Sequence, residues 1–533
     1  MAKRASTATG PATIPDLIDS LVSRSGDDIA LIAGDDRISF RDLADRSARL
    51  AQGLEGLGLG QGDIAALWLQ NDPNWLVALL ACARIGVNAI ALNTRFRHAE
   101  LTDVFTRLSP RAIFYQPVYR GIDFAAIVDA ACQESRLADM AEIFCAPPTG
   151  QSGLTVEGLI EENTQTTTTP RDAADNLIMF ATSGTTGSPK FVQHTHGSVV
   201  SHAIAVGTGF GMAATDTKML QALPYCGVFG FCQAMGALAV ERPSVVLENF
   251  DPEDAVVAIP RHRVTHVNMT DDMLSACASA AQDVSVFSSL RFVGAASFNR
   301  GAGHLDEIAR ATGIPIVGLY GSSEAQALFA RRSIDAPSDR RCEAGGRPVS
   351  PEADIRVRDV ETGKLLTTDD VGELEICGPS LFSGYVNDPE ATARAMTADG
   401  YFRTGDLALL ERSGEFRFDA RMGDAIRLGG FLVNPDEISG FIETIGGIGD
   451  CIVVGVQTPD GPKAAAFVIR DPNFRGGHLD GDAVRDQCRK YLAPYKVPAL
   501  VHEIEVFPVT DGPNGVKVQR GELRALAGVL LGQ

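Results

Sequence analysis

The feature that most constrains this chain is the stretch from Thr182 to Lys190, TSGTTGSPK. It combines hydroxyl side chains, glycines and one lysine, and it is too small and too polar to form part of a hydrophobic core. Gly184 and Gly187 allow turns that other residues avoid, so that backbone N–H groups can converge on one ligand. The hydroxyl donors beside them are Thr182, Ser183, Thr185 and Thr186. We therefore predict a polyphosphate-binding loop, with Lys190 supplying positive charge.

The position of the loop along the chain supports this prediction. The apolar run Asn176–Ala181 precedes it and is typical of a buried strand. The loop would leave the carboxyl end of that strand, where α/β sheets bind ligands. It is not the loop of P-loop ATPases, because Ser188 and Pro189 separate the last glycine from the lysine. Composition alone favours the alternative of an ordinary solvated turn.

Further polar segments follow this loop in a fixed order. They are YGSSE (320–324), YFRTGD (401–406), ARMGD (420–424), GGFLVNPDEI (429–438) and NGVKVQR (514–520). The whole series, which extends over nearly the entire chain, resembles the adenylate-forming acyl-CoA synthetases. Peptide-synthetase adenylation domains and luciferases are relatives of that family.

Hydrophobic periodicity predicts an α/β fold. Ser39 and Asp42 form a capping box before a helix that should end near Gly58. A strand at 64–69, a helix at 75–85 and a strand at 87–92 follow, and this alternation is typical of parallel sheet with helical crossovers. Later in the chain, 266–269 and 316–319 are expected strands, with Thr270 capping a helix.

The resemblance implies two domains. Residues 1–423 would form a large N-terminal domain of Rossmann-like αβ subdomains with a distorted β-barrel portion. Residues 424–533 would form a small, mobile α+β domain that turns about a hinge at Asp424. Strands at 451–456 and 464–469 and a helix at 481–491 suit this small domain.

Bulk composition excludes several classes of function. A formal net charge of −20 without a long basic cluster disfavours nucleic acid as a partner. The most hydrophobic stretch, 75–92, contains Arg84 and Asn88, and no apolar segment follows the basic N-terminus. The ten cysteines form no CxxC pair. We expect a cytoplasmic enzyme without an integral membrane segment, and a homodimer is left open.

Activating a carboxylic acid with ATP brings two anions together, so the site needs cations aimed at the α-phosphate. Lys190, Mg²⁺ and Lys517 fit this need. The resemblance implies that Glu324 holds Mg²⁺ and that Lys517 bridges the carboxylate and the α-phosphate. A plain surface lysine is the alternative for Lys517, and Lys496 is the competing candidate for its role.

The resemblance also assigns the nucleotide and CoA contacts. Within YGSSE, Tyr320 would lie against adenine and Ser323 would bond the α-phosphate, with Gly321 and Ser322 between them. Asp406 and Arg421 would bind the ribose hydroxyls. Two glycines would let the pantetheine arm of CoA pass close to the backbone, or else simply form a tight turn. These glycines are Gly429 and Gly430.

The expected acid pocket has small residues at several positions. Gly227 stands where relatives often carry a histidine or an aromatic residue, and Tyr225 and Phe229 could provide apolar walls. The other small residues are Gly294, Ala295, Ala296 and Gly318. We predict a bulky or extended apolar acid: aryl, alicyclic, or a medium- to long-chain fatty acid. Asp271 is the one acidic residue that could hold the amino group of an amino-acid substrate.

The leading prediction is an acid:CoA ligase that uses ATP, Mg²⁺ and CoA. An enzyme that loads the acyl group onto a carrier protein would need almost the same motifs. A non-catalytic nucleotide- or acyl-binding protein on this fold is the alternative from another class, against which the intact candidate residues argue.

Overall fold

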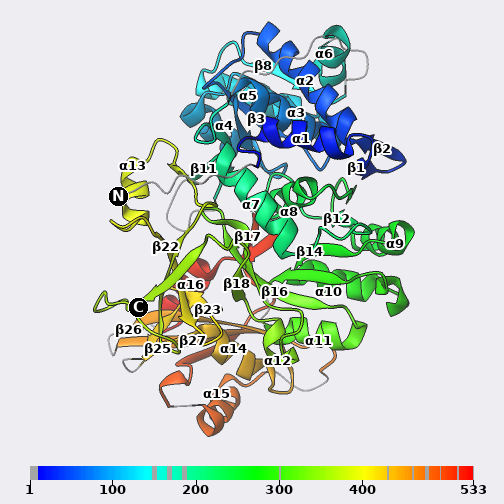
Figure 1. Cartoon of the computed structure of the whole chain (residues 1–533). Coiled ribbons are helices and arrows are strands. Elements are labelled where there is room, and N and C mark those ends of the chain that lie inside the picture. Colours follow the sequence, from blue (N-terminus) through cyan, green and yellow to red (C-terminus); the bar gives the residue numbers. More distant parts are fainter. Residues whose placement is uncertain are drawn as a thin grey trace.

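The computed structural model describes residues 10–146, 153–164, 171–182, 189–298, 302–428, 431–458, 461–474, 479–492, 494–512 and 515–531. Helices and strands alternate through most of them, and two large sheets dominate the molecule, one with 13 strands and one with 8 (Figure 1). The predicted α/β class is confirmed.

The smaller sheet is almost entirely parallel. From edge to edge its strands are β21 (Gly384–Tyr385), β11 (Phe191–Thr195), β10 (Asn176–Ala181), β4 (Asn88–Ala91), β3 (Ile64–Trp68), β5 (Ala112–Tyr115), β8 (Ala141–Phe144) and β9 (Leu154–Thr155). Only β11 and β21 run antiparallel to their neighbours. The strand predicted before the phosphate loop is therefore present as β10.

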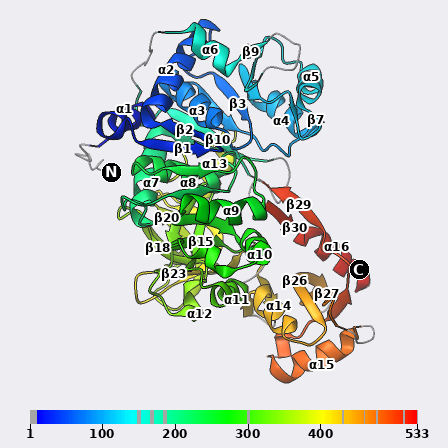
Figure 2. The same ribbon diagram turned by 90° about the vertical axis from the view of Figure 1, so that its right-hand side faces the viewer.

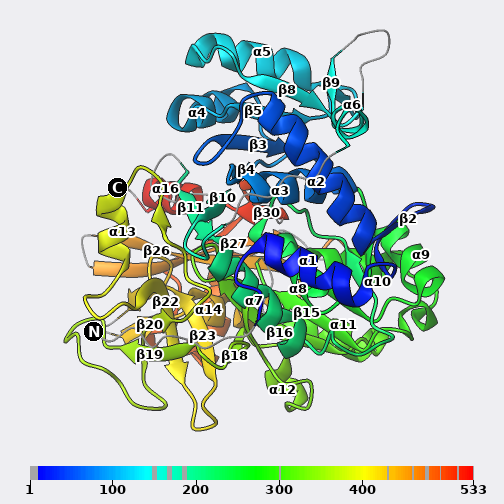
Figure 3. The same ribbon diagram turned by 45° about the horizontal axis from the view of Figure 1, so that its top comes forward.

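Helices cover both faces of the smaller sheet (Figure 3). Ala65 and Leu67 of β3 pack into the same core as α2 (Phe40–Gly56), α3 (Pro73–Ile85) and α6 (Val156–Glu162). Ala66 and Trp68 face α4 (His98–Leu108) and α5 (Phe124–Ser135) instead. This alternation places an apolar residue at every position of the strand, as a strand buried on both faces requires.

Local signals at the predicted helix ends are confirmed. Ser39 caps α2, and the reciprocal hydrogen bonds between Ser39 and Asp42 complete the capping box. Helix α3 ends at Ile85, as predicted, and the Gly86 that caps it has a φ of +75°, the left-handed conformation that glycine accepts without steric cost. Thr270 caps α10 (Asp271–Ala280), as predicted.

The larger sheet joins a parallel half to an antiparallel half. Its order is β19 (Asp354–Arg358), β20 (Val371–Cys377), β22 (Phe402–Leu410), β23 (Phe416–Arg421), β18 (Gly345–Pro348), β17 (Gln326–Arg331), β16 (Ile316–Ser322), β15 (Phe292–Ala296), β14 (His266–Thr270), β12 (Met219–Gln221), β13 (Ser244–Val246), β1 (Ile29–Ala33) and β2 (Asp36–Ser39). Neighbours from β1 to β16 pair in parallel, and those from β16 to β19 pair antiparallel. The antiparallel strands occupy the region expected to hold the distorted barrel.

A hydrophobic core between the two sheets connects them. It includes residues of α3, of α7 (His196–Gly209), of α8 (Val228–Ala239) and of strands from both sheets. The remaining α-helices before Asp424 are α1 (Ile14–Ser25), α9 (Pro252–His262), α11 (Ala302–Thr312), α12 (Ser338–Arg341) and α13 (Pro389–Ala395). The strand β11, which pairs with β10, contacts the turn after β16 through His194 and Ser323, and this contact positions the site described below.

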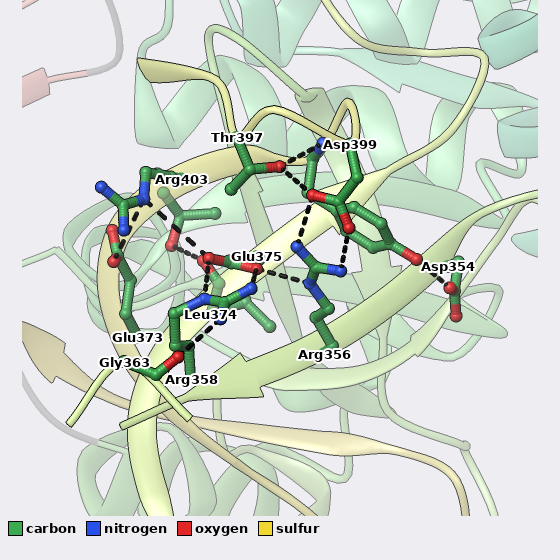
Figure 4. Close-up of polar contacts among 12 residues, drawn as sticks. Asp354, Arg356, Arg358, Gly363, Glu373, Leu374, Glu375, Thr397, Asp399 and Arg403 are labelled. Atoms are coloured by element: carbon green, nitrogen blue, oxygen red, sulfur yellow. Dashed lines mark hydrogen bonds and ion pairs between the residues drawn. The ribbon is translucent and has the colours of Figure 1, made fainter. Parts of the chain in front are cut away.

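A buried charge network anchors the antiparallel strands β19, β20 and β22 (Figure 4). Glu375 is 0% exposed and accepts hydrogen bonds from Arg356 at 2.5 Å and from Arg358 at 2.6 Å. Burial alone would raise the pKa of Glu375, but the hydrogen bonds from the two arginines outweigh it and lower that pKa. Glu375 also pairs across the ladder with Arg403, just before Asp406 on β22.

Replacing Glu375 should therefore unfold the protein more easily. In Glu375→Gln, Arg358 loses its carboxylate partner and Arg356 keeps only Asp399 among the described carboxylates. We expect a loss of about 3 kcal/mol in the free energy of unfolding. Glu373→Gln is the matched control, because Glu373 makes one ion pair within the described part of the chain, to Arg403, at 3.8 Å. Urea unfolding of both variants measures this, and equal small losses would contradict the anchoring role.

The last fifth of the chain packs around its own cores (Figure 2). Its elements are β24 (Ile426–Leu428), β25 (Phe431–Val433), α14 (Pro435–Glu443), β26 (Ile448–Thr458), β27 (Gly461–Arg470), α15 (Gly481–Tyr491), β28 (Leu500–Glu503), β29 (Val509–Gly512), β30 (Gly515–Val518) and α16 (Arg520–Leu530). The two expected strands lie within β26 and β27, and the expected helix is α15. Among the described residues, buried side chains after Asp424 share no hydrophobic cluster with the preceding chain.

The segment around Lys517 is more regular than expected. We predicted a terminal segment without core periodicity, whereas β30 pairs with β29 in a hairpin in which Lys517 lies opposite Thr510. In Figure 2 this red hairpin extends from the orange C-terminal part toward the large sheets. Among the described residues, no helix combines the length and the apolar character needed to cross a membrane.

Candidate active site

The ends of the phosphate loop are closed by a hairpin. Thr182 follows β10 and Lys190 precedes β11, and the Thr182 N–H donates to the Lys190 carbonyl at 2.9 Å. The chain therefore returns antiparallel instead of entering a helix directly, as a P-loop does. The predicted contacts Ser183, Gly184, Thr185, Thr186 and Gly187 lie outside the described residues.

Tyr385 brings the two ends of the predicted phosphate site together. Its hydroxyl donates to Glu324 Oε1 at 2.8 Å, and the Lys190 ammonium lies 4.5 Å from the centroid of its ring. Burial, and then the Glu324 carboxylate, raise the pKa of this phenol. Tyr385 thus lies between the cation and the carboxylate expected at the triphosphate, a role that the sequence analysis missed.

Two buried histidines hold the turn that carries Glu324. The expected strand before YGSSE continues to Ser322, so the turn begins at Ser323. His194 Nε2 donates to the Ser323 carbonyl at 2.8 Å, and His202 Nε2 donates to the Ala327 carbonyl at 2.7 Å. The Nδ1 atoms of both rings accept no hydrogen bond from the described residues. The turn is therefore fixed by neutral imidazoles.

This arrangement predicts that the free energy of unfolding decreases as the pH is lowered. Burial lowers the pKa of both imidazoles to about 4, whereas an exposed histidine in the unfolded chain titrates near 6.5. The unfolded chain therefore binds more protons as the pH falls from about 6.5 to about 4, and each imidazole should cost about 2 kcal/mol at pH 5 relative to pH 7.

Urea unfolding at pH 7 and pH 5 tests this prediction. His202→Gln keeps a donor for the Ala327 carbonyl but does not titrate. The difference in unfolding free energy between the two pH values should shrink by about 2 kcal/mol in this variant. An unchanged difference would show that His202 is not neutral and buried.

The predicted ribose site consists of a buried carboxylate and its partners. The Tyr320 hydroxyl donates to Asp406 Oδ2 at 2.6 Å, and Arg421 Nε lies 2.9 Å from Oδ1. Burial raises the pKa of Asp406, and Arg421 and Tyr320 oppose that rise. Oδ1 has no hydrogen bond of good geometry within the described residues. A ribose hydroxyl could donate to this oxygen, so the arrangement fits a nucleotide.

The ring of Tyr320 has protein neighbours of its own. It packs edge-on against Phe416, with ring centroids 5.0 Å apart, and it is buried. Gly321 lies beside it in β16, where a Cβ would come within 2.7 Å of the Ala327 backbone. The chain therefore needs glycine at this position for close packing of β16 on β17.

Lys517 lies beside these residues although it belongs to the C-terminal hairpin. Its pKa is lowered by burial and then by the Arg421 guanidinium, and its ammonium lies 5.0 Å from the Phe298 ring centroid. Lys496, the competing candidate, forms an ion pair with Glu437 within the C-terminal part. The structure therefore brings Lys517, and not Lys496, to the predicted nucleotide site.

The proposed hinge residue has a partner at the end of the chain. Asp424 forms an ion pair with Arg524 of α16, and Arg524 also donates to the Gly423 carbonyl at 3.0 Å. The Asp424 N–H donates to the Arg421 carbonyl at 2.9 Å. Gly429 and Gly430, predicted to line the CoA passage, lie outside the described residues.

The residues predicted to line the acid pocket are mostly buried. Tyr225 stacks on Trp75 with ring centroids 5.4 Å apart, Phe229 is buried in α8, and Gly227 is the residue before α8. Ala295 and Ala296 end β15. The small size of two glycines also has a packing reason, because a Cβ on Gly294 would lie 2.1 Å from Asn268 Oδ1 and one on Gly318 would lie 2.0 Å from the Glu343 carbonyl.

Asp271 is already engaged by the protein backbone. This 0% exposed carboxylate accepts hydrogen bonds from Asp272 N and from Phe298 N, both at 3.1 Å. Its position in the first turn of α10 also favours a negative charge. An amino group would have to displace these donors, which argues against an amino-acid substrate.

A metal ion at this site would take most of its ligands from the phosphates of bound ATP and from water. Among the described residues no group of three or more His, Cys, Asp or Glu side chains could hold a metal. Mg²⁺ commonly takes one or two protein carboxylates and fills its other positions with phosphate oxygens and water. A single Glu324 beside a triphosphate is compatible with that pattern.

Comparisons with known proteins point to one family. The family model described as AMP-binding enzyme matches residues 19–386. A 3-[(3aS,4S,7aS)-7a-methyl-1,5-dioxo-octahydro-1H-inden-4-yl]propanoyl:CoA ligase of Mycobacterium tuberculosis is 31% identical over 96% of this chain and 99% of that protein. A 3-hydroxybenzoate–CoA ligase of Aromatoleum sp. is 26% identical over 94% of each protein.

Solved structures give the same result. ATP-bound MatB from Rhodopseudomonas palustris has a TM-score of 0.85 at 26% identity and covers 97% of this chain and 99% of its own. The anthranilate CoA ligase AuaEII in complex with anthranoyl-AMP has a TM-score of 0.84 at 21% identity, with 98% of both chains covered, which shows the shared fold.

Proposed function

The chain belongs to the AMP-binding enzyme family, and we propose that it is an ATP-dependent acid:CoA ligase that first forms an acyl-adenylate and then an acyl-CoA thioester. The observation that carries this proposal is the convergence of Lys517, Arg421, Asp406 and Tyr320 at one place. These residues come from strands on both sides of Asp424, and together they supply a cation and a carboxylate that can accept a hydrogen bond from a ribose hydroxyl.

Each side chain has a role in the first half-reaction. The carboxylate oxygen of the acid attacks the α-phosphorus of ATP, and pyrophosphate leaves. Asp406 accepts hydrogen bonds from the ribose and thereby orients the nucleotide, with Arg421 beside it. Lys190 and Lys517 offset the charge that develops on the α-phosphate and on the leaving pyrophosphate. Glu324 would help to hold Mg²⁺, which would neutralise charge on the phosphates.

The second half-reaction needs a different arrangement of the same site. The thiol of CoA attacks the acyl carbonyl and displaces AMP, so the place occupied by Lys517 has to open. We place the domain boundary at Asp424, with residues 1–423 and 424–533 as the moving parts. The separate hydrophobic clusters on either side of Asp424 support this boundary.

The acid is proposed to be bulky or extended and apolar, of the aryl, alicyclic or medium- to long-chain class. The glycine at position 227 and the occupied Asp271 support this proposal. The names of relatives that act on an indanyl propanoate and on 3-hydroxybenzoate agree with it.

ATP–pyrophosphate exchange over a panel of acids tests the substrate class. We expect exchange with aryl, alicyclic or medium- to long-chain acids, and little exchange with acetate or with amino acids. A preference for acetate or for an amino acid would overturn the proposed class while leaving adenylation itself intact.

The acceptor is proposed to be free CoA. Loading of a carrier protein is the alternative, because its phosphopantetheine presents the same thiol. Offering CoA and a phosphopantetheinylated carrier protein to the same enzyme-bound acyl-adenylate distinguishes the two acceptors by which thioester forms.

We also propose that the enzyme works in the cytoplasm, since all ten cysteines are free and most of them are buried.

A further inference from the structure

A phenylalanine just after the carboxyl end of the interior strand β15 is in contact with Lys517. Phe298 follows the carboxyl end of β15, and Lys517 Nζ lies 5.0 Å from the centroid of its ring. An ammonium over an aromatic face is attracted by the negative charge of that face. The contact therefore links the large sheet to the C-terminal hairpin at the site where Lys517 is needed.

The hydrophobic core does not explain Phe298. Its side chain is 40% exposed and is a member of none of the hydrophobic clusters that the described residues form. An exposed phenylalanine on its own needs no explanation. This one, however, presents its ring to the lysine that we assign to adenylation.

The backbone of Phe298 is held in place by a hydrogen bond to Asp271. Its N–H donates to Asp271 Oδ2 at 3.1 Å, and Asp271 is 0% exposed in the first turn of α10. A buried carboxylate that accepts backbone N–H groups is a strong, short-range anchor. The position of Phe298 is thus fixed by a rigid helix end.

Lys517 has few other reasons to remain at this place. Burial and the nearby Arg421 guanidinium both disfavour its ammonium group. No carboxylate of the described residues forms an ion pair with it. In the described part of the chain, the Phe298 ring is the attractive partner of its charge.

We propose that Phe298, anchored by Asp271, is a positioning residue that seats the Lys517 ammonium at the adenylation site before the acid and ATP bind. This inference rests on the proposed function, because it assumes that Lys517 acts in acyl-adenylate formation. A weak, non-covalent seat suits a residue that has to leave again, since rotation of the small domain breaks a single contact.

Phe298→Leu tests the seat, because leucine keeps the apolar bulk but lacks the aromatic face. Single-turnover acyl-adenylate formation should slow about 5-fold, while thioester formation from supplied acyl-adenylate and CoA stays unchanged. The KM values for the acid and for ATP should not change. Phe298→Trp, which provides a larger aromatic face, should form the acyl-adenylate at the wild-type rate.

A double-mutant cycle separates the seat from a general structural effect. In a Lys517→Ala background, Phe298→Leu should cause no further slowing, because the group that it positions is gone. Independent, multiplicative losses in the two variants would overturn the proposal, as would equal losses in Phe298→Leu and Phe298→Trp.

Chemical labelling of lysines gives a readout that does not depend on catalysis. An amine-reactive reagent should modify Lys517 several-fold faster in Phe298→Leu than in the wild type or in Phe298→Trp, with Lys496 as the internal reference. Faster labelling in a protein that adenylates no acid would support the seat and refute the proposed function. Active adenylation with unchanged labelling and unchanged rates would refute the seat alone.

Discussion

Lys517→Ala should slow acyl-adenylate formation by about 10²–10³-fold, the loss expected when one well-aimed charge-stabilising donor is removed. The structure supplies the reason, because the β29–β30 hairpin carries Lys517 to the vicinity of Arg421, where its side chain is partly buried. Charge stabilisation is strongest where water is excluded. Rapid-quench measurement of acyl-adenylate from acid and ATP gives the rate.

Thioester formation should respond differently to the same change. When acyl-adenylate and CoA are supplied, Lys517→Ala should react at nearly the wild-type rate, because the lysine has left the site by then. Lys496→Ala is the matched control, since Lys496 forms its ion pair with Glu437 away from the nucleotide site. Equal losses in both half-reactions would indicate misfolding or a shared role, and no loss in adenylation would make Lys517 an ordinary surface residue.

Asp424→Pro should slow thioester formation by about 10²-fold while acyl-adenylate formation changes much less, because a misplaced reacting group costs about that much. Proline fixes φ and removes the N–H that now donates to the Arg421 carbonyl. A hinge needs free dihedrals, and Gly423 beside it adds freedom. Comparison of the two half-reactions in single turnovers measures the effect.

Asp424→Ala is the control that isolates the backbone effect. It removes the ion pair with Arg524 but leaves the backbone N–H and the freedom of φ. We expect it to retain most of the thioester-forming activity, since this ion pair is only half-buried and is screened by solvent. If proline and alanine impair both half-reactions to the same degree, the pivot lies elsewhere in the chain.

Local sequence signals were sufficient for the scaffold. The capping box at Ser39 and Asp42, the end of α3 at Ile85 and the apolar run of β10 each depend on neighbouring residues, and each is present in the structure. Helix α15 has the predicted ends. Such features are set by backbone hydrogen bonding and by side-chain periodicity, which a single segment encodes.

Contacts between distant segments could not be predicted in this way. Tyr385 reaches Glu324 because β21 pairs with β11, and no local pattern around Tyr385 shows that pairing. His194 and His202 could be recognised only as buried residues, without their carbonyl partners. The contact of Phe298 with Lys517 could be recognised only once the folded chain placed the C-terminal hairpin next to it.

Family resemblance assigned most of the predicted site where local pattern could not. It assigned Lys517 to the nucleotide, although nothing in the NGVKVQR segment itself distinguishes this lysine from an exposed one. The packing at Gly294 and Gly318 shows the limit of such transfer, because their size also serves close contacts with Asn268 and the Glu343 backbone. The acid pocket is therefore the part of the site most in need of direct measurement.

One measurement tests the central claim most directly. Purified protein is mixed with ATP, Mg²⁺, CoA and each acid of the panel, and AMP and acyl-CoA are quantified by mass spectrometry. The account predicts equimolar AMP and acyl-CoA for at least one aryl, alicyclic or medium- to long-chain acid, and no steady turnover when CoA is left out. Binding of ATP without release of AMP for every acid would contradict it and would point to a binding protein.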